Sequence, residues 1–397
     1  MAWERIETVR SVALGIWVEH GGAHDAEDQK GLAHLLEHMV FKGTRTRTAR
    51  QIAAEIEQVG GSLDAYTSHD HTGYLARVPE EHLEIAVDVL AGLVFHPVLR
   101  RDDLRLEREV ILEELAGLED SPDQLVFELH GEQLYGRHPY GRSILGTAQT
   151  VASIGTEDLE RLQASAYVPG NCVIAAAGRL TSERLLEAID RRVPEAGETA
   201  RQDLPPLETG SAGFRLVERP GGRQSHIVAG ALAVPHSSPL RYAVILVEAA
   251  LGGGMSSRLF QHIREDLGLA YSVYSYHAFY RAAGHVGAYL GTRPETAERA
   301  REELISELRA VAEEGLTSEE VEQMRRQLKG QLLVGLESTV SRMQRLAGLS
   351  LYREPYITLD ELADRIDGIT PEQIAEAAAF FHPDRLSVLE LRPVEDR

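Results

Sequence analysis

Cysteine is nearly absent from this sequence, since Cys172 is the single one among 397 residues. An intramolecular disulfide is therefore excluded, and a chain without disulfides is typical of a reducing compartment. Cys172 opens the apolar stretch Cys-Val-Ile-Ala-Ala-Ala-Gly, which predicts a buried strand over 172–177. We interpret its thiol as a small core side chain rather than a reactive group.

Long apolar runs are absent as well. No run of about 18 apolar residues, the length that crosses a bilayer as a helix, occurs in the sequence. The first ten residues, Met-Ala-Trp-Glu-Arg-Ile-Glu-Thr-Val-Arg, contain no apolar core of a signal peptide. These absences and the single cysteine predict a cytoplasmic protein with no membrane partner.

Positive charge is scarce, because 41 lysines and arginines stand against 62 aspartates and glutamates, giving a net charge of −21. This balance argues against a nucleic acid or an anionic membrane as the main partner. The acidic excess has two explanations, a solubilising surface or an acidic interior that attracts basic peptides. We favour the first, because charge alone does not select a substrate.

A chain of this length fits two to three domains of common size. Residues 194–209 are rich in proline, glycine and charge, and predict a linker between an N-terminal domain, 1–193, and a C-terminal domain, 210–397. The second half repeats the predicted order of helices and strands at an offset of about 210 residues, which indicates an internal duplication. Gly252–Gly254 lacks the following Lys-Ser/Thr pair of a phosphate-binding loop, which argues against nucleotide binding.

Three polar side chains interrupt an apolar helical pattern early in the chain. The segment Gly-Leu-Ala-His-Leu-Leu-Glu-His-Met-Val-Phe-Lys-Gly-Thr, residues 31–44, contains His34, Glu37 and His38. Residues four apart share a helix face, with Cβ atoms roughly 5–6 Å apart, so both histidines can reach one metal ion. The order H-x-x-E-H is the inverse of the H-E-x-x-H zinc motif, and the second half has no copy of it. The first half is therefore expected to carry a metal whose ligands the second half has lost.

A predicted helix over 101–118 offers carboxylates for the same ion. One face, followed at helical spacing, carries Glu107, Val110, Ile111, Glu114 and Leu118. Burying an ionised carboxylate without a partner is costly, so two of them in an apolar stripe indicate a nearby cation. The alternative is that the edge of this face is solvated, and periodicity alone leaves both explanations open. Two histidines that still need a third ligand favour the metal.

Four further histidines lie in loops and are weaker candidates. His20 and His24 belong to a glycine-containing loop that is a poor frame for a metal, and we expect them to be solvent-exposed. His69 and His71 flank a predicted turn between two short strands in 62–78, and we expect surface residues there too.

Five ordered segments resemble those of the pitrilysin-type zinc peptidases, and in particular the bacterial peptidases related to the processing peptidases. The resemblance covers essentially the whole chain. The segments are residues 31–44, 64–68, 107–114, 138–147 and 256–271.

The resemblance implies an α+β fold of two homologous domains, each a mostly antiparallel β-sheet packed with α-helices. It implies one Zn²⁺ per chain, held by His34, His38 and Glu114, with Glu107 supporting these ligands. A catalytic zinc keeps one coordination position for water. Glu37 would be the general base on that water.

The resemblance also implies residues that bind the substrate. The second domain of family members supplies an arginine and a tyrosine seven residues apart, near the substrate and the oxyanion, and Arg264 and Tyr271 match that spacing. A substrate peptide adds as a strand to a sheet edge. The corresponding residues here are Asp64, Ala65, Tyr66 and Thr67. The chain is thus predicted to be a zinc-dependent endopeptidase that hydrolyses extended or unfolded peptides.

The chain departs from the family pattern at two places. Asp64 stands where many members have asparagine, which changes the contacts offered to a substrate backbone. Members also begin with a strand ahead of the one that matches Ser11. Either that strand is short here or the natural chain starts earlier.

Two other functions stay open. The chain could be a noncatalytic partner subunit of a heterodimeric processing peptidase-like complex, against which the intact ligands argue. It could instead be a metal-dependent hydrolase of a non-peptide bond, against which the substrate strand argues. The expected assembly is a homodimer, with a heterodimer containing an inactive homologue as the alternative.

Overall fold

The computed structural model describes residues 1–195, 203–207, 210 and 212–394. The chain forms two compact units, and each unit combines three stretches of sequence. The first unit consists of Met1–Ala116, Arg142–Leu204 and Val334–Tyr356, and the second of Gly117–Gly141, Pro205–Leu333 and Ile357–Arg397.

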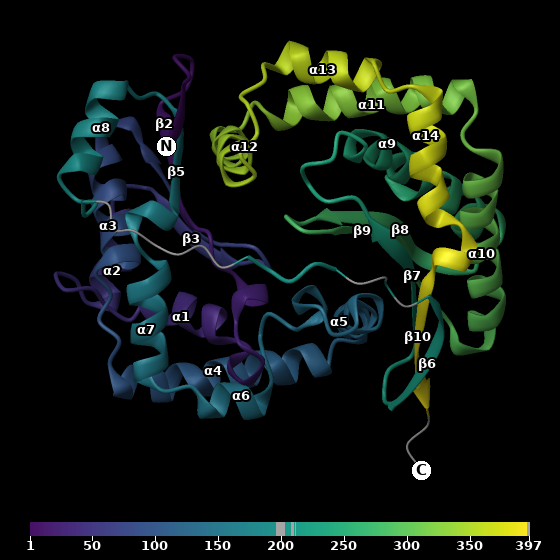
Figure 1. Ribbon diagram of the computed structural model, residues 1–397, viewed down its shortest axis with the longest axis horizontal. Helices are drawn as coiled ribbons and strands as arrows, with labels where there is room; N and C mark the ends of the chain where they lie inside the picture. Colours follow the sequence, from purple (N-terminus) through teal and green to yellow (C-terminus); the bar gives the residue numbers. More distant parts are fainter. Residues whose placement is uncertain (196–202, 208–209, 211, 395–397) are drawn as a thin grey trace. The chain divides into compact units, whose positions relative to one another are not determined.

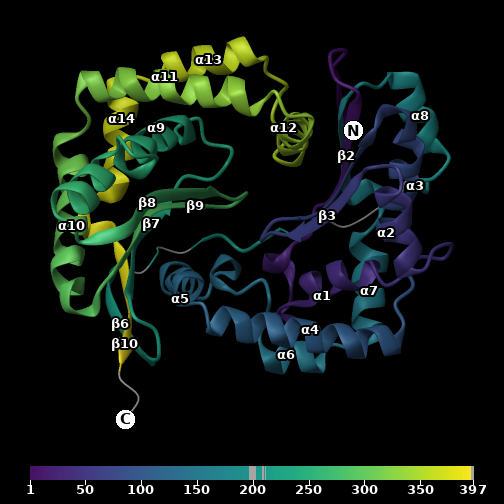
Figure 2. The same ribbon diagram turned by 180° about the vertical axis from the view of Figure 1, so that it is seen from behind.

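The first unit is built on a five-stranded mixed sheet with the order β1-β5-β2-β4-β3 (Figure 1). Its strands are β1 (Ala2–Arg5), β2 (Ser11–Val18), β3 (Ser62–Thr67), β4 (Thr72–Pro79) and β5 (Cys172–Gly178). β1 pairs with β5 in parallel, and the other neighbours are antiparallel. β3 therefore lies at one end of the sheet, beside α1 (Figure 2).

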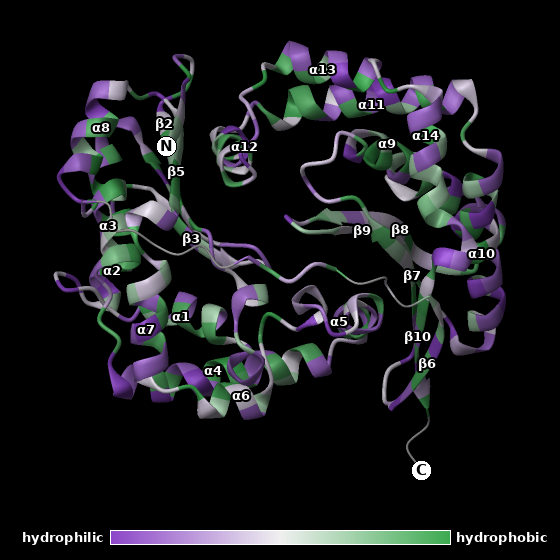
Figure 3. Ribbon diagram, in the orientation of Figure 1, coloured by the Kyte–Doolittle hydropathy of each residue, from purple (hydrophilic) through white to green (hydrophobic). Residues whose placement is uncertain are grey.

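Helices from the first half of the sequence cover one face of this sheet. Their apolar side chains form a core with Val12, Leu14 and Ile16 of β2. The helix of residues 83–95 is buried almost throughout, because only Glu84 and Asp88 interrupt its apolar sequence, and it is largely green in Figure 3. The helices are α1 (Leu32–Val40), α2 (Ala49–Glu57), α3 (Leu83–Phe95), most of α4 (Arg101–Glu119), α6 (Ala148–Ser153), α7 (Thr156–Ala166) and α8 (Ser182–Asp190).

The opposite face of the first sheet is covered by a helix from the far end of the sequence. Met343 and Leu346 of α12 (Thr339–Leu351) pack with Ala13 and Trp17 of β2. Both faces of β2 are thus buried, which explains why its sequence is apolar rather than alternating.

The second unit repeats this architecture. Its sheet has the order β6-β10-β7-β9-β8, the same topology as the first, with β6 and β10 as the parallel pair. Its strands are β6 (Gly213–Pro220), β7 (Ser225–Ala233), β8 (Ala270–Phe279), β9 (Gly284–Thr292) and β10 (Ser387–Val394). The helices from the second half are α9 (Arg241–Gly252), α10 (Ala297–Glu314), α11 (Ser318–Gly335), α13 (Leu359–Asp367) and α14 (Pro371–Ala378).

A helix from the first half covers the other face of the second sheet. Leu125 and Val126 of α5 (Pro122–Tyr135) pack with Val228 and Leu389. His130 of α5 also donates from Nε2 to the Ser387 carbonyl at 2.9 Å. The two halves of the sequence therefore exchange one helix each, α5 for α12.

The α+β fold in two domains is confirmed, and the shared strand order is what an internal duplication requires. Because the units exchange helices, the division into 1–193 and 210–397 follows the two repeats rather than the compact units. The predicted linker, 194–209, lies largely outside the described residues. The family's extra first strand is present as the four-residue β1. Over the described residues, no helix is both long and apolar enough to span a bilayer.

One helix of the second unit has an unusual geometry. Phe260–Asp266 is a π-helix. The N–H of Leu267 donates to the carbonyl of His262, five residues earlier, at 3.0 Å. π-Helical turns are rare and often occur at functional sites.

Candidate metal centre

The motif residues lie on one side of α1. Its other side is core, because Leu35, Leu36 and Met39 are fully buried. His34 and His38 are half-buried, and their ring centroids are 4.6 Å apart. The spacing of four residues therefore places both imidazoles together, as predicted.

The start of α1 is fixed by contacts outside the motif. Gly31 adopts a left-handed conformation with φ 91°, and a Cβ there would approach the Leu145 carbonyl oxygen to 2.7 Å. Glycine has no side chain to cap the helix, and the buried carboxylate of Asp25 takes that role. It accepts from the N–H of Gly31 at 3.1 Å and of Ala33 at 3.2 Å. Asp25 thus sets where the helix begins, and nothing in the motif itself points to it.

Glu114 of α4 faces both imidazoles. Its Oε2 lies 3.8 Å from His34 Nε2, and its Oε1 lies 3.7 Å from His38 Nε2. Both separations are too long for hydrogen bonds. Ligand atoms around a tetrahedral zinc are roughly 3.3–3.5 Å apart, so a small contraction would bring these three onto one ion.

The donor set suits zinc. Two imidazole nitrogens and one carboxylate oxygen lie within 4.8 Å of one another, the only such group of three among the described residues. Burial and, less strongly, the charge of His38 lower the pKa of His34 to about 4. His34 is therefore neutral at pH 7, and its buried Nδ1 has no hydrogen-bond partner in the described chain. A neutral imidazole, which has one nitrogen with a lone pair, is the form that binds metals.

Glu107 contacts the ring nitrogen of His38 that does not face Glu114. Its Oε2 lies 3.2 Å from His38 Nδ1, and its Oε1 lies 2.5 Å from Lys42 Nζ. A proton on Nδ1 that is donated to Glu107 leaves Nε2, the nitrogen facing Glu114, with its lone pair. Lys42 was not foreseen, although it follows His38 by four residues, just beyond the end of the same helix.

The apolar face of α4 differs from the predicted stripe. Val110 is 43% exposed and Glu114 is exposed, whereas Leu104, Glu107 and Ile111 are buried. Of the two explanations left open for this face, a solvated edge holds at Glu114, whereas Glu107 is buried. The helix presents Glu107 to the core and Glu114 to the rim of the cluster.

Glu37 lies beside the cluster and is held by the sheet. Its Oε2 accepts a hydrogen bond from Thr67 Oγ1 of β3 at 2.8 Å. Burial raises the pKa of Glu37, and the bond from Thr67 opposes that rise. A carboxylate with a raised pKa is a stronger base, suited to taking a proton and returning it.

The predicted substrate strand coincides with β3, the end strand of the first sheet. Thr67 contacts Glu37, and the Tyr66 hydroxyl accepts from Trp17 Nε1 at 3.0 Å. Asp64 is exposed, and the next residue, Ala65, is half-buried. The strand edge and the general-base candidate are therefore neighbours.

The four loop histidines do not join the cluster. His71 Nε2 lies 3.2 Å from the Tyr66 hydroxyl, and His24 Nδ1 accepts from the Gly21 N–H at 3.2 Å. The expectation that His20 is solvent-exposed is wrong, since its side chain is 12% exposed and lies 3.6 Å from Asp25. It packs against the carboxylate that caps α1.

Arg264 and Tyr271 lie together in the second unit. The π-helix carries Arg264, whose guanidinium is 4.6 Å from the ring centres of both Phe260 and Tyr271. The β8–β9 ladder passes from Ala270 directly to Ser272, so Tyr271 is the extra residue of a β-bulge and is 76% exposed. Both residues line one hollow. Cation–π stacking holds the two side chains as a pair.

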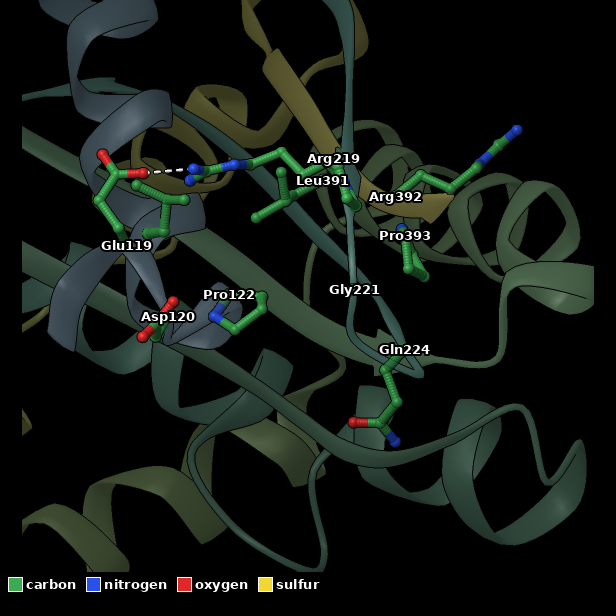
Figure 4. Close-up of a pocket in the computed structure, with 11 residues that line it drawn as sticks. Glu119, Asp120, Pro122, Arg219, Gly221, Gln224, Leu391, Arg392 and Pro393 are labelled. Carbon is green, nitrogen blue, oxygen red and sulfur yellow. Dashed lines mark ion pairs between the residues drawn. The ribbon is translucent and has the colours of Figure 1, made fainter. Parts of the chain in front are cut away.

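A second hollow of this unit lies where α5 begins (Figure 4). Asp120 and Pro122 line it, and Glu119 forms an ion pair with Arg219 at 2.5 Å across it. None of the predicted site residues lines this hollow.

Two family models match the chain. Residues 1–148 match the model described as insulinase (peptidase family M16), and residues 153–328 match the model of the peptidase M16 inactive domain. The metal cluster lies in the first match, and Arg264 and Tyr271 lie in the second.

Relatives that match over nearly the full length of this chain are named as zinc proteases. The chain is 36% identical over 374 residues to the uncharacterized zinc protease YmxG of Bacillus subtilis, covering 94% of this chain and 90% of that protein. It is 35% identical over 405 residues to an uncharacterized zinc protease of Streptomyces coelicolor, covering 99% and 87%.

Solved structures share the fold. A peptidase M16 inactive domain from Pseudomonas fluorescens has a TM-score of 0.91 at 24% identity, covering 100% of this chain and 96% of that one. A protease from Helicobacter pylori has a TM-score of 0.91 at 19% identity, covering 98% and 96%.

Proposed function

Because the chain belongs to peptidase family M16, the insulinase family, we propose that it is a zinc-dependent endopeptidase acting on extended or unfolded peptides. The observation that carries this proposal is the cluster of His34, His38 and Glu114 with Glu37 beside it. The zinc protease names of the relatives support the same reaction class.

Each residue of the cluster would have a separate role in metal binding or proton transfer. His34 and His38 would hold the metal through imidazole nitrogens, and Glu114 through its carboxylate. Zinc, when bound, would lower the pKa of a water molecule and polarise the peptide carbonyl. Glu37, whose Oε2 accepts a hydrogen bond from Thr67, would take the proton from water and later return it to the leaving amine.

The open edge of β3 favours extended substrates. A peptide that adds to this edge as a strand is held by main-chain hydrogen bonds and needs no particular side chain. Folded proteins rarely offer a free strand, because their backbone groups are already paired. Unfolded peptides are therefore the proposed substrates.

Arg264 and Tyr271 are proposed to serve the same reaction. Their spacing of seven residues matches the family pair, and the π-helix and the β-bulge present them together. A tyrosine hydroxyl can donate to a developing oxyanion, and an arginine can bind a substrate carbonyl or hold the tyrosine in place.

The decisive experiment measures zinc and cleavage in the same preparations. Wild type is compared with Glu114→Ala and with Glu113→Ala, which removes an exposed neighbouring carboxylate. We expect about one zinc per chain in wild type and Glu113→Ala, little in Glu114→Ala, and chelator-sensitive cleavage of an unstructured peptide wherever zinc is bound.

Each contrary outcome has a distinct meaning. Zinc bound without cleavage would favour a noncatalytic partner subunit. Cleavage of small esters but not peptides would favour a hydrolase of another bond. No zinc in wild type would overturn the proposal.

A further inference from the structure

The open edge of β3 presents a defined set of backbone groups. Among the described strands, β4 is the one neighbour of β3, and Ser68 donates from its N–H to the His71 carbonyl at 2.8 Å. Hydrogen-bonded pairs alternate along an antiparallel ladder. Counting back from Ser68 in twos, the even-numbered residues bond to β4. Leu63, Ala65 and Thr67 therefore direct their N–H and C=O groups to the open edge.

The pairing of β4 with β2 agrees with this alternation. Glu80 donates from its N–H to the Arg10 carbonyl at 3.1 Å, so these two residues form a hydrogen-bonded pair next to the β2–β4 ladder. Hydrogen-bonded residues on β4 then recur every second residue, at Val78, Ala76 and Tyr74. Tyr74, which stands opposite Ala65, thus uses its backbone groups on β2. The Ala65 N–H is not taken by β4.

The Ala65 N–H is instead covered by its neighbour. Asp64 Oδ1 accepts from it at 2.9 Å, and the Asp64 side chain is exposed. Two residues further along the edge, Thr67 holds Glu37. The covered donor is thus at the middle of the edge that borders the general-base candidate.

We propose that Asp64 guards the substrate edge. Its carboxylate occupies the donor that a substrate carbonyl needs, so every peptide that adds to β3 must first displace it. This inference rests on the proposed function, in which peptides bind to this edge. The guard weakens binding of all peptides, whatever their sequence, and keeps the edge from pairing with other chains.

Two conservative variants separate the hydrogen bond from the charge. Asp64→Glu keeps the charge, but its longer side chain does not reproduce the contact with the next N–H. Asp64→Asn keeps the acceptor oxygen and removes the charge. Asp64→Ala removes both.

The test measures binding without turnover. A fluorescein-labelled unstructured peptide is titrated into zinc-loaded Glu37→Gln protein carrying each change, and Kd is read from fluorescence anisotropy. We expect Asp64→Glu and Asp64→Ala to bind the peptide roughly fivefold more tightly than the protein that retains Asp64. This factor corresponds to one modest hydrogen bond that the peptide no longer has to displace. Asp64→Asn should tighten binding less than about twofold, because its amide oxygen still accepts. Glu57→Gln, at the exposed end of α2, changes the net charge equally and should leave Kd unchanged.

The outcomes are distinct. Equal Kd values for the four residues at position 64 would overturn the guard while cleavage of the same peptide by the unsubstituted chain upholds the proposed function. Tighter binding in Asp64→Asn but not in Asp64→Glu would show charge repulsion and also overturn the guard. Absence of both binding and cleavage would overturn the proposed function, and the guard with it.

Discussion

At the scale of single residues, Glu37 and His38 are adjacent on α1, yet their substitutions should have different effects on zinc content and turnover. Glu37→Gln preserves the shape and the acceptor for Thr67 but cannot take a proton. We expect zinc content to remain near one per chain while kcat falls by roughly 10²–10⁴-fold. His38→Ala should lose both zinc and turnover. Metal analysis with steady-state kinetics checks this, and retained turnover in Glu37→Gln would remove the general-base assignment.

Tyr271 is 76% exposed, so its hydroxyl contributes little to packing. Tyr271→Phe keeps the ring over Arg264 and removes only that hydroxyl. We expect kcat to fall, by up to roughly 10²-fold for a lost oxyanion donor, with KM nearly constant. Tyr274→Phe, on the same strand, is the matched control. A change confined to KM would make Tyr271 a binding residue instead.

The extent to which the site was predictable differs from residue to residue. His34, Glu37 and His38 lie on one helix, where sequence spacing fixes spatial neighbours. Glu114 needed the resemblance, because periodicity left its burial open and the structure finds it exposed. Asp25 and Lys42 act through contacts that depend on how a loop and a helix end are placed, which no local pattern encodes.

At the scale of elements, local patterns could not show which sheets α5 and α12 cover. Each has an apolar face, but the sheet that this face covers belongs to the other repeat. β6 was also missed, because most of its residues are exposed. β5 was predicted over 172–177 and spans Cys172–Gly178, since its apolar run and the glycine that ends it are local.

α12 should stabilise the first sheet although it is distant in sequence. Met343 is fully buried with Trp17, so Met343→Ala leaves a cavity and should cost about 2–4 kcal/mol of unfolding free energy. Leu333→Ala, 60% exposed on α11, should change it by less than about 0.5 kcal/mol. Denaturant titration followed by tryptophan fluorescence measures both. Equal effects of the two substitutions would contradict the assignment of α12 to this sheet.

α5 carries a histidine that makes the second unit sensitive to acid. Burial lowers the pKa of His130 to about 4, whereas its unfolded value is about 6.5. The unfolded chain therefore binds the proton first, and stability is lost as pH falls from about 6.5 toward 4. Between pH 7 and pH 5 this loss is about 2 kcal/mol.

His130→Gln tests this contribution directly. The glutamine amide can still donate to the Ser387 carbonyl but does not titrate. We expect the loss of unfolding free energy between pH 7 and pH 5 to be about 2 kcal/mol smaller in the variant. The same loss in both proteins would show that His130 does not remain neutral in the folded state.

At the scale of the whole molecule, the exchange of α5 and α12 ties the two repeats together. Without α12, residues 1–198 would expose the face of the first sheet formed by Ala13, Trp17 and Leu75. Without α5, residues 199–397 would expose the face formed by Val228, Tyr289 and Leu389. Contiguous apolar surfaces of this kind promote aggregation.

Each half should therefore be insoluble or poorly folded when it is produced alone. Produced together, the two halves should copurify as a one-to-one complex, because the cut at 198/199 falls in the predicted linker and removes neither exchanged helix. Size-exclusion chromatography and thermal melting of the three preparations measure this. A half that is monomeric and melts cooperatively alone would contradict it, since its sheet would then be stable with one face uncovered.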